Sequence, residues 1–140
     1  MKEYTEEELW FHKKDQKIYG LMYRPKKAQK APLIIICHGF GGSHKVNLVS
    51  ADIYANAGYA VCSIDFCGGS DKTISDGSVM EMSVITEKED LLAVVGQENF
   101  LILMREEFIS GAKAREHLLQ LLQPPRFRTK LQGKFFCIRH

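Results

Sequence analysis

The stretch Ala31-Pro-Leu-Ile-Ile-Ile-Cys-His-Gly-Phe-Gly-Gly42 decides the fold class of this chain of 140 residues. Leu33 to Cys37 is a continuous apolar run that is rich in β-branched residues. Such a run is typical of a strand that is covered on both faces, as in a parallel sheet. A glycine-rich loop follows at once, and glycines allow the backbone to approach a substrate closely. We therefore expect a buried parallel strand that ends in a functional loop.

A second strand with a glycine-rich loop follows along the chain. Ala60 to Phe66 is the strand, and Cys67-Gly-Gly-Ser70 is the loop. Between the two strands, apolar residues recur at helical spacing over residues 45–57, and Gly58 is well placed to end that helix. We expect the next helix to open at Thr86, with Glu89 completing a capping box. The alternation of strands and helices predicts right-handed βαβ units on a parallel sheet.

Two further strands are expected before this unit, at residues 8–14 and 17–24, with a tight turn at Asp15-Gln16. The predicted fold class is therefore α/β: an N-terminal β-hairpin, then a parallel βαβα unit. After Gln97 the pattern stops. Residues 99–109 and 112–123 are compatible with helices, and residues 126–140 show no clear periodicity. The predicted C-terminal tail is helical or irregular.

Composition and charge narrow the class of protein. The chain is 45% hydrophobic and 26% charged, which is typical of a globular domain. Residues 1–97 carry a net charge of −2 and residues 98–140 a net charge of +4, so the tail differs in charge from the rest. The basic tail contains no recognisable nucleic-acid motif, and no apolar run reaches membrane-spanning length. We expect neither nucleic acid nor membrane as a partner.

The cysteines and the N-terminal residues indicate the cellular compartment in which the protein is expected to reside. None of the four cysteines has the spacing of a metal site, and three lie in or beside expected buried strands. Buried free thiols indicate a reducing compartment, and the acidic N-terminus is unlike a signal peptide. We expect a cytoplasmic protein that holds no metal and no cofactor. The cysteines are Cys37, Cys62, Cys67 and Cys137.

Four segments together resemble the α/β-hydrolase family, especially bacterial esterases of the feruloyl or cinnamoyl type and related serine peptidase-like hydrolases. The order and spacing of the segments carry the resemblance, which covers about residues 17–97. The resemblance implies a truncated α/β-hydrolase fold and an ester or acyl substrate for the intact parent protein. The segments are His38-Gly-Phe-Gly-Gly42, Asp65-Phe-Cys-Gly-Gly-Ser70, Ser75-Asp-Gly77 and Met82-Ser-Val-Ile-Thr-Glu-Lys-Glu-Asp-Leu91.

The resemblance also implies roles for the first glycine-rich loop. In this family the residue after His-Gly donates one backbone N–H to the oxyanion, which places that role on Phe40. The surrounding oxyanion loop is His38, Gly39, Gly41 and Gly42. We expect His38 to hold the loop in shape and Asp65 to bond loop amides, with neither taking part in chemistry. Binding of a phosphate at the same glycines is an alternative that fits known phosphate motifs less well.

The nucleophile of a serine hydrolase is missing. The family carries it in a Gly-x-Ser-x-Gly elbow on the next strand, and the catalytic acid and histidine come later. No Gly-x-Ser-x-Gly occurs in the 140 residues. We do not assign the missing roles to His44 or Asp76, and Cys67 is expected to be a packed thiol. The chain as it stands is expected to be inactive.

The tail allows a specific hypothesis. If its codons are read one base earlier, Ile109 to Arg115 can encode Leu-Trp-Gly-Lys-Ser-Gln-Gly, and the continuation can encode an alanine-rich helix. The hypothesis is that residues 98–140 are a frameshift product, with the slip near Gly96 to Glu98. Residues 1–97 would then be the N-terminal portion of a hydrolase domain. The alternative is a genuine, divergent tail.

Three functions follow. The first is an inactive N-terminal fragment of a serine hydrolase, and the second is a non-catalytic interaction module that uses the basic helical tail. The third is an enzyme that a separate chain completes. Without the elbow strand, the Leu33–Cys37 strand would be an open apolar edge, which favours self-association.

Overall fold

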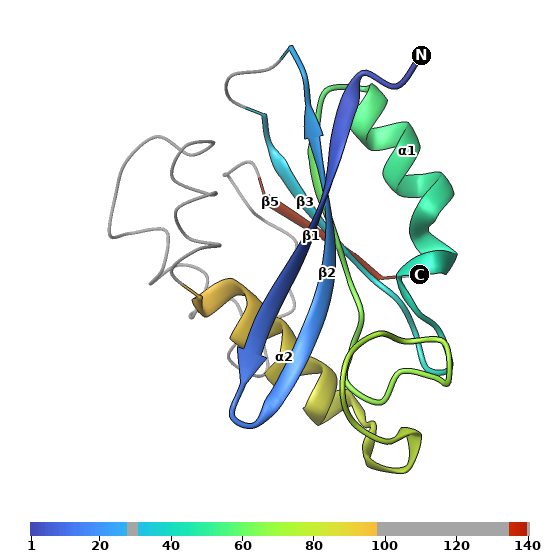
Figure 1. Cartoon of the computed structure of the whole chain (residues 1–140), viewed down its shortest axis with the longest axis vertical. Helices are drawn as coiled ribbons and strands as arrows, with labels where there is room; N and C mark the ends of the chain where they lie inside the picture. The colour runs from blue at the N-terminus through green and yellow to red at the C-terminus, as the bar shows by residue number, and fades with distance from the viewer. Residues whose placement is uncertain (28–30, 98–134, 140) are drawn as a thin grey trace.

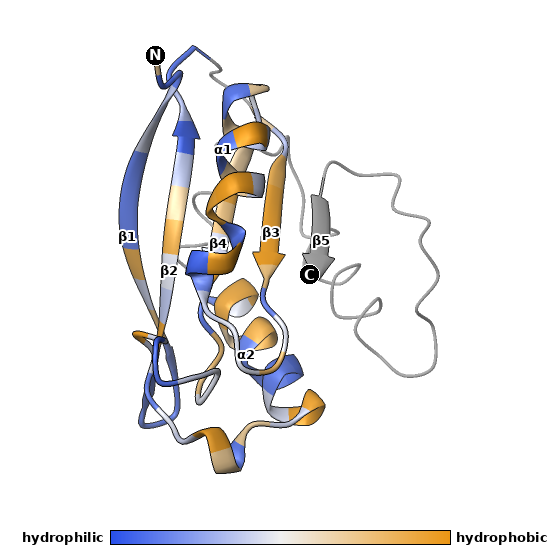
Figure 2. Cartoon of the chain, turned by 90° about the vertical axis from the view of Figure 1, so that its right-hand side faces the viewer, coloured by the Kyte–Doolittle hydropathy of each residue, from blue (hydrophilic) through white to orange (hydrophobic). Residues whose placement is uncertain are grey.

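The computed structural model describes residues 1–27, 31–97 and 135–139. They form a five-stranded sheet in the order β1-β2-β4-β3-β5, with one helix on each face (Figures 1 and 2). No helix in these residues is long and apolar enough to cross a membrane. The strands are β1 (Tyr4–Lys13), β2 (Gln16–Pro25), β3 (Leu33–Cys37), β4 (Ala60–Ile64) and β5 (Phe135–Arg139), and the helices are α1 (Leu48–Asn56), α2 (Val84–Gly96) and the short 3-10 helices η1 (His44–Asn47) and η2 (Val79–Glu81).

The N-terminal hairpin is confirmed, and both of its strands are longer than the sequence predicts. β1 pairs with β2 in antiparallel register from Tyr4 opposite Pro25 to Lys13 opposite Gln16. The turn is Lys14-Asp15, one residue earlier than expected, and Lys14 adopts a φ of 52°. β2 then pairs in antiparallel fashion with β4, which joins the hairpin to the parallel part of the sheet.

β3 and β4 pair in parallel and are buried along their whole length, as expected for strands between two helices. Successive side chains of a strand point to opposite faces. Alternate residues of β3 therefore enter two different cores. Leu33, Ile35 and Cys37 lie in the core that holds Val94 and Val95 of α2, whereas Ile34 and Ile36 lie in the core that holds Ala51 and Ala55 of α1.

Helix α1 presents small residues to the sheet. Ala51 and Ala55 are fully buried, while Val49 and Ile53 are exposed, as is Val46 on the preceding η1. The apolar spacing that predicts this helix is therefore largely that of its outer side. Alanine contributes little volume, so the branched side chains in this layer come from the sheet, as Ile34, Ile36 and Val61.

Gly58 ends α1, as the sequence predicts. Its φ is 93°, in the left-handed region that favours glycine. The Gly58 N–H donates to the Ala55 carbonyl and the Tyr59 N–H donates to the Tyr54 carbonyl, both at 3.1 Å. These two bonds form a Schellman motif, which satisfies the last carbonyls of the helix and directs the chain into β4.

Helix α2 begins earlier than the sequence predicts. Its N-cap is Ser83, whose hydroxyl accepts a hydrogen bond from the Thr86 N–H at 3.2 Å. The Thr86 hydroxyl in turn accepts from the Ser83 N–H at 2.8 Å. The expectation that Thr86 and Glu89 form the capping box is wrong, because Thr86 occupies the third helical position of a box that starts at Ser83.

Strand β5 lies in the tail and was not expected. It pairs in parallel with β3, from Leu33 opposite Phe135 to Cys37 opposite Arg139. The prediction that β3 is an open edge is therefore wrong. The predicted helices at residues 99–109 and 112–123 lie outside the described residues, as do most of residues 126–140.

We predict that Ser83→Ala lowers the free energy of unfolding by about 1 kcal/mol, because the Thr86 N–H loses its acceptor at the helix terminus. Urea denaturation followed by circular dichroism measures the change. Ser83→Asp is the matched control, since its carboxylate can accept the same bond and should retain the stability. Equal stability of Ser83→Ala and the unsubstituted chain would contradict the role of this cap.

Candidate functional site

The candidate site lies at the carboxyl ends of β3 and β4, where each strand runs into a tight turn. The first turn is Gly39–Gly42, closed by a hydrogen bond of 3.1 Å from the Gly42 N–H to the Gly39 carbonyl. Gly41 stands at its third position with a φ of 75°. A type II turn requires this conformation at that position, which explains why the loop contains a glycine there.

Phe40 occupies the second position of this turn and points its side chain outward, with 71% of its surface exposed. No residue in the described ranges accepts a hydrogen bond from the Phe40 N–H. A free backbone donor held in a rigid turn is the kind of group that stabilises a developing oxyanion.

The second turn is Phe66–Gly69, which has the same form. The Gly69 N–H donates to the Phe66 carbonyl at 3.0 Å, and Gly68 at the third position has a φ of 70°. Gly68 also lies directly against the backbone of Ser78, so that a methyl group on Gly68 would overlap the Ser78 carbonyl oxygen. The two turns and the loop before η2 therefore pack together.

The ring of His38 joins the two turns. It is fully buried and accepts a hydrogen bond from the Phe66 N–H on Nε2 at 2.9 Å. Its Nδ1 lies 2.8 Å from the Gly39 carbonyl oxygen. Because Nε2 is the acceptor, Nδ1 carries the proton and donates to Gly39. Both ring nitrogens are engaged within the loops, so His38 shapes the site and has no nitrogen free for general-base catalysis.

Two glycines make room for this ring. A Cβ atom on Gly69 would lie 2.5 Å from Cε1 of His38, and one on Gly42 would lie 3.0 Å from Cβ of His38. The contact with the Gly69 position is far shorter than any real Cβ contact. Gly42, a member of the expected oxyanion loop, and Gly69 in the second turn thus both permit the packing of the buried histidine.

Asp65 binds loop amides, as the sequence analysis expects. Its fully buried carboxylate accepts hydrogen bonds from the His44 N–H and from the Ile74 N–H, the latter at 2.9 Å. The His44 ring nitrogen Nδ1 lies 3.0 Å from both carboxylate oxygens. Asp65 therefore ties the start of η1 to the loop after β4.

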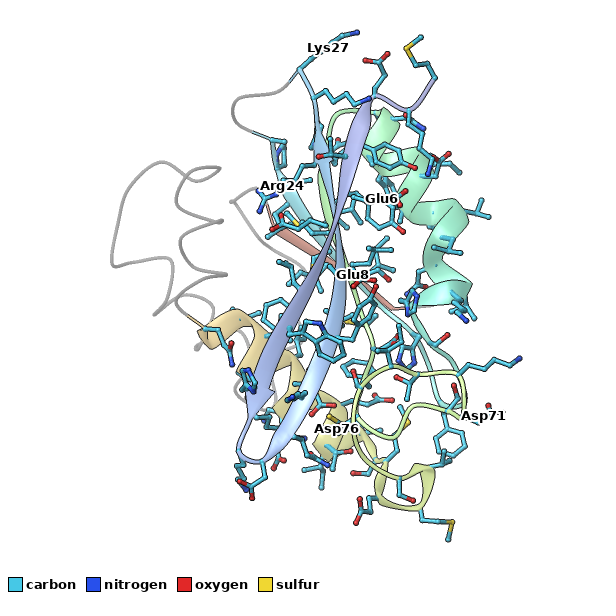
Figure 3. The ribbon with its side chains drawn as sticks, viewed as in Figure 1. Glu6, Glu8, Arg24, Lys27, Asp71 and Asp76 are labelled. Carbon is cyan, nitrogen blue, oxygen red and sulfur yellow. The ribbon has the colours of Figure 1, made fainter. Side chains whose placement is uncertain are left out.

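The Ser75-Asp-Gly77 segment fastens this loop to β2. The Ser75 hydroxyl donates to the Asp65 carbonyl at 2.6 Å and accepts from the Tyr19 N–H at 2.8 Å. The Asp76 carboxylate accepts from the Lys17 N–H at 2.8 Å, and Figure 3 shows Asp76 beside the hairpin. Asp76 thus links this loop to the start of β2.

Cys67 is a packed thiol. It is buried, and burial is the main cause that raises the pKa of its thiol to about 12, with the nearby Asp90 adding to the rise. Since the thiolate is the nucleophilic form of cysteine, burial and the raised pKa disfavour a nucleophilic role for Cys67 near neutral pH.

Sequence reasoning missed the buried ion pair between Lys13 and Asp90. Asp90 is fully buried on α2, pairs with the Lys13 ammonium group and accepts a hydrogen bond from the Cys67 N–H at 2.7 Å. Removal of one partner of such a pair costs about 3–5 kcal/mol. The signal in the sequence was an acidic residue directly before Leu91 and one helical turn before Val94, on the side of the helix that is expected to be buried. Within the ranges that the structure describes, no three His, Cys, Asp or Glu side chains are grouped so that they could hold a metal ion.

We predict that Gly69→Ala destabilises the protein by about 1–3 kcal/mol, because the new methyl group displaces the His38 ring. Gly96→Ala is the matched control: none of the described residues lies within 4 Å of a Cβ atom at this position, and alanine favours a helix. Thermal unfolding of both variants measures the difference. Similar melting temperatures for the two variants would show that the His38 packing is unimportant for stability.

The buried thiols predict a loss of stability in alkali. The pKa values of Cys62 and Cys67 are raised from 9.0 to about 12 in the folded protein, chiefly by burial. The unfolded chain therefore releases these protons first, and stability that is intact below pH 9 falls between pH 9 and about 12. The loss is about 1 kcal/mol per thiol for each pH unit in this window.

The melting temperature measured from pH 8 to pH 10 tests this dependence, below the range in which the buried Tyr19 and Tyr23 contribute. Cys67→Ala should show a smaller decline than the unsubstituted chain. An identical decline in both proteins would mean that the Cys67 thiol is ionised as readily in the folded state as in the unfolded state.

Comparisons with known structures place this geometry in a fold. The thioesterase domain from the curacin biosynthetic pathway is 19% identical with a TM-score of 0.53, and the match covers 65% of this chain and 32% of that domain. A hypothetical protein from Pseudomonas aeruginosa is 21% identical with a TM-score of 0.57, and the match covers 76% of this chain and 33% of that protein. Alpha/beta hydrolase domain-containing protein 10 from mouse is 18% identical with a TM-score of 0.51, and the match covers 66% of this chain and 35% of that protein.

This chain thus spans about a third of the length of these solved structures. No curated protein matches the sequence. Residues 7–91, which run from β1 into α2 and contain both turns, match the family model described as Acetyl xylan esterase (AXE1). The match covers more than half of the chain and agrees with the α/β-hydrolase fold of the solved structures. The chain therefore belongs to the acetyl xylan esterase family and has the N-terminal part of an α/β-hydrolase fold.

Proposed function

We propose that this chain is the N-terminal segment of a serine hydrolase that cleaves esters or related acyl bonds, with the Phe40 N–H as one donor of the oxyanion hole. The observation that carries the proposal is the turn Gly39–Gly42 at the carboxyl end of β3. It leaves the Phe40 N–H without an acceptor among the described residues. His38, Gly41 and Gly42 hold that turn in shape.

The chain is inactive by itself under this proposal. Acyl transfer by this route needs a nucleophile, a base and an acid in addition to oxyanion donors. The described side chains nearest the turn are already committed, since His38 bonds two backbone groups and Asp65 bonds the His44 ring and loop amides. The buried Cys67 thiol is protonated near neutral pH. The turn can therefore bind an oxyanion, but none of these described side chains beside it is available to generate one.

We further propose that residues 98–140 arise from a shifted reading frame and that residues 1–97 are the hydrolase portion. The family match ends at residue 91, close to this boundary, which supports the division. A cytoplasmic location is part of the proposal and is supported by the buried free thiols Cys37, Cys62 and Cys67. Self-association would involve the outer edge of β5, because β5 covers β3.

The first test of the proposal is to sequence the codons for residues 95–140 and to compare the activity of two proteins. The 140-residue chain should neither hydrolyse a p-nitrophenyl ester nor react with a fluorophosphonate, whereas a chain with the frame corrected should do both. Fluorophosphonate labelling of the 140-residue chain would contradict its inactivity. Codons that cannot encode Gly-x-Ser-x-Gly in the shifted frame would refute the frameshift.

The oxyanion donor is tested by Phe40→Pro in the frame-corrected chain. Proline is favoured at the second position of this turn but has no N–H, so the substitution removes the donor and keeps the backbone shape. We expect kcat to fall by about 10²–10³-fold. Phe40→Ala is the control, because it removes the exposed ring and retains the N–H. Equal rates for the proline and alanine variants would exclude the Phe40 N–H from the oxyanion hole.

A further inference from the structure

The outer edge of β1 forms one border of the sheet, at the opposite end from β5. β1 is 10 residues long and pairs on one side with β2, and no described strand lies on its other side. Figure 1 shows β1 in front of the other strands. An edge strand presents backbone N–H and C=O groups that can pair with another chain, so natural edges are normally protected or occupied.

Alternate residues of β1 direct their backbone groups toward this edge. Trp10 lies opposite Tyr19. The Tyr19 N–H donates to the Ser75 hydroxyl at 2.8 Å and the Tyr19 carbonyl accepts from the Asp65 N–H at 2.9 Å, both on the far side of β2. Trp10 and Tyr19 are therefore a non-hydrogen-bonded pair, and the Trp10 backbone groups point outward. By the same alternation, the outward residues also include Glu6, Glu8 and His12.

The His12 carbonyl agrees with this direction. It accepts a hydrogen bond of 2.7 Å from the side-chain amide of Gln97 at the end of α2, so it is not enclosed between β1 and β2. A carbonyl oxygen has two lone pairs and can accept a further hydrogen bond. The contact with Gln97 therefore does not close the edge to another strand.

The charges of β1 and its turn form an inverted palindrome around Trp10. The sequence reads Glu6-Glu-Glu-Leu-Trp-Phe-His-Lys-Lys14, with three acidic residues before the apolar centre and three basic residues after it. Charges of a single sign would repel a second copy of the strand in every antiparallel register. Opposite signs at the two ends instead attract a second copy that runs in the opposite direction.

The charges also select one register for such a pair. If Trp10 lies opposite Trp10 of a second copy, every acidic residue of the palindrome faces a basic one. A register centred on Glu8 would place that carboxylate opposite its own copy, and opposed like charges destabilise a strand pair. The facing residues in the register centred on Trp10 are Glu6 and Lys14, Glu7 and Lys13, Glu8 and His12, and Leu9 and Phe11.

The acidic side chains on the outer face of β1 are exposed and only weakly held. Figure 3 shows Glu6 and Glu8 on the same side of the strand. Glu6 pairs with the exposed Lys2 at 2.6 Å, and Glu8 accepts a hydrogen bond from the Tyr19 hydroxyl at 3.1 Å. Exposed ion pairs contribute little to stability, so these contacts can be exchanged at little cost.

The basic residues differ in how firmly they are held. Lys13 is bound to the buried Asp90, whereas His12 and Lys14 are exposed. The charge pairing between two copies therefore depends chiefly on His12 and Lys14. Trp10 is 46% exposed at the centre of the pair, where two aromatic rings can pack against each other.

We propose that the outer edge of β1 binds β1 of a second copy of this chain, in the antiparallel register with Trp10 on the two-fold axis. The outward backbone groups supply the hydrogen bonds, as in other cases of strand addition, and the facing charges fix the register. The proposal does not depend on the proposed function, and it concerns the border of the sheet that β5 does not form.

A charge exchange between Glu8 and His12 tests the pairing in the 140-residue chain. Sedimentation velocity over a range of concentrations measures the dimer. Glu8→Lys and His12→Glu should each weaken the dimer by about 10-fold, because each places like charges opposite each other twice. An equimolar mixture of the two variants, and the double variant Glu8→Lys/His12→Glu, should recover the dimer, since both restore opposite charges.

Two further variants separate the edge from general effects of charge and folding. Glu89→Lys makes the same change of charge at an exposed position of α2 and should leave the dimer unchanged. Trp10→Pro should abolish the dimer, because proline lacks the N–H that points outward at the two-fold axis. Trp10→Thr is its matched control, since threonine also removes the ring but keeps the N–H and favours a strand.

A chain that stays monomeric at every concentration its solubility allows would overturn the proposal. So would a dimer that Glu8→Lys and Trp10→Pro leave intact, which would place the contact elsewhere, such as on the edge of β5. Failure of the mixture and of the double variant to recover a dimer that the single variants weaken would refute the register and the proposal with it. Circular dichroism of each variant shows that the chain is folded.

Discussion

The buried imidazole of His38 is the contact on which the candidate site depends. It accepts a hydrogen bond from the turn after β4 and donates one to the turn after β3, so that the two loops are held at a fixed separation. Two glycines, Gly42 and Gly69, leave space for the ring. Without the ring, the turn that presents the Phe40 N–H would lose its side-chain link to the turn after β4. The site is therefore built around an interior residue, and the exposed donor is its outermost part.

A second set of buried polar groups holds the surrounding loops. Asp65 accepts hydrogen bonds from the His44 and Ile74 amides, and the Ser75 hydroxyl joins the same region to β2. Asp90 accepts a hydrogen bond from the Cys67 amide and pairs with the Lys13 ammonium group. Each of these groups is buried and partnered, and loss of one partner would leave another without its hydrogen bond. The loops at this end of the sheet consequently behave as a single unit.

The sequence allowed the hairpin, the parallel pair β3 and β4, the helix end at Gly58 and the role of Asp65 to be predicted, because each depends on local pattern or on one motif. It did not reveal the start of α2, since Thr86 and Ser83 are both good capping residues and Thr86 can serve either as the N-cap or as the third residue of a box that starts at Ser83. It did not reveal β5, because the short segment Phe135–Arg139 carries no clear periodicity, and its pairing with β3 depends on a distant strand. The Lys13–Asp90 pair was missed for the same reason.

The place of β5 has a consequence for folding kinetics. Its partner strand lies about a hundred residues earlier in the chain, so the pairing closes a long loop, which is entropically expensive and slow compared with the local contacts of the hairpin and the βαβ unit. The sheet is thus expected to have an edge that assembles last and opens first, while β2, β4 and β3 remain paired. Hydrogen exchange would divide such a molecule into a stable centre and a labile border, and the border is also the part where another chain could most easily replace a native strand.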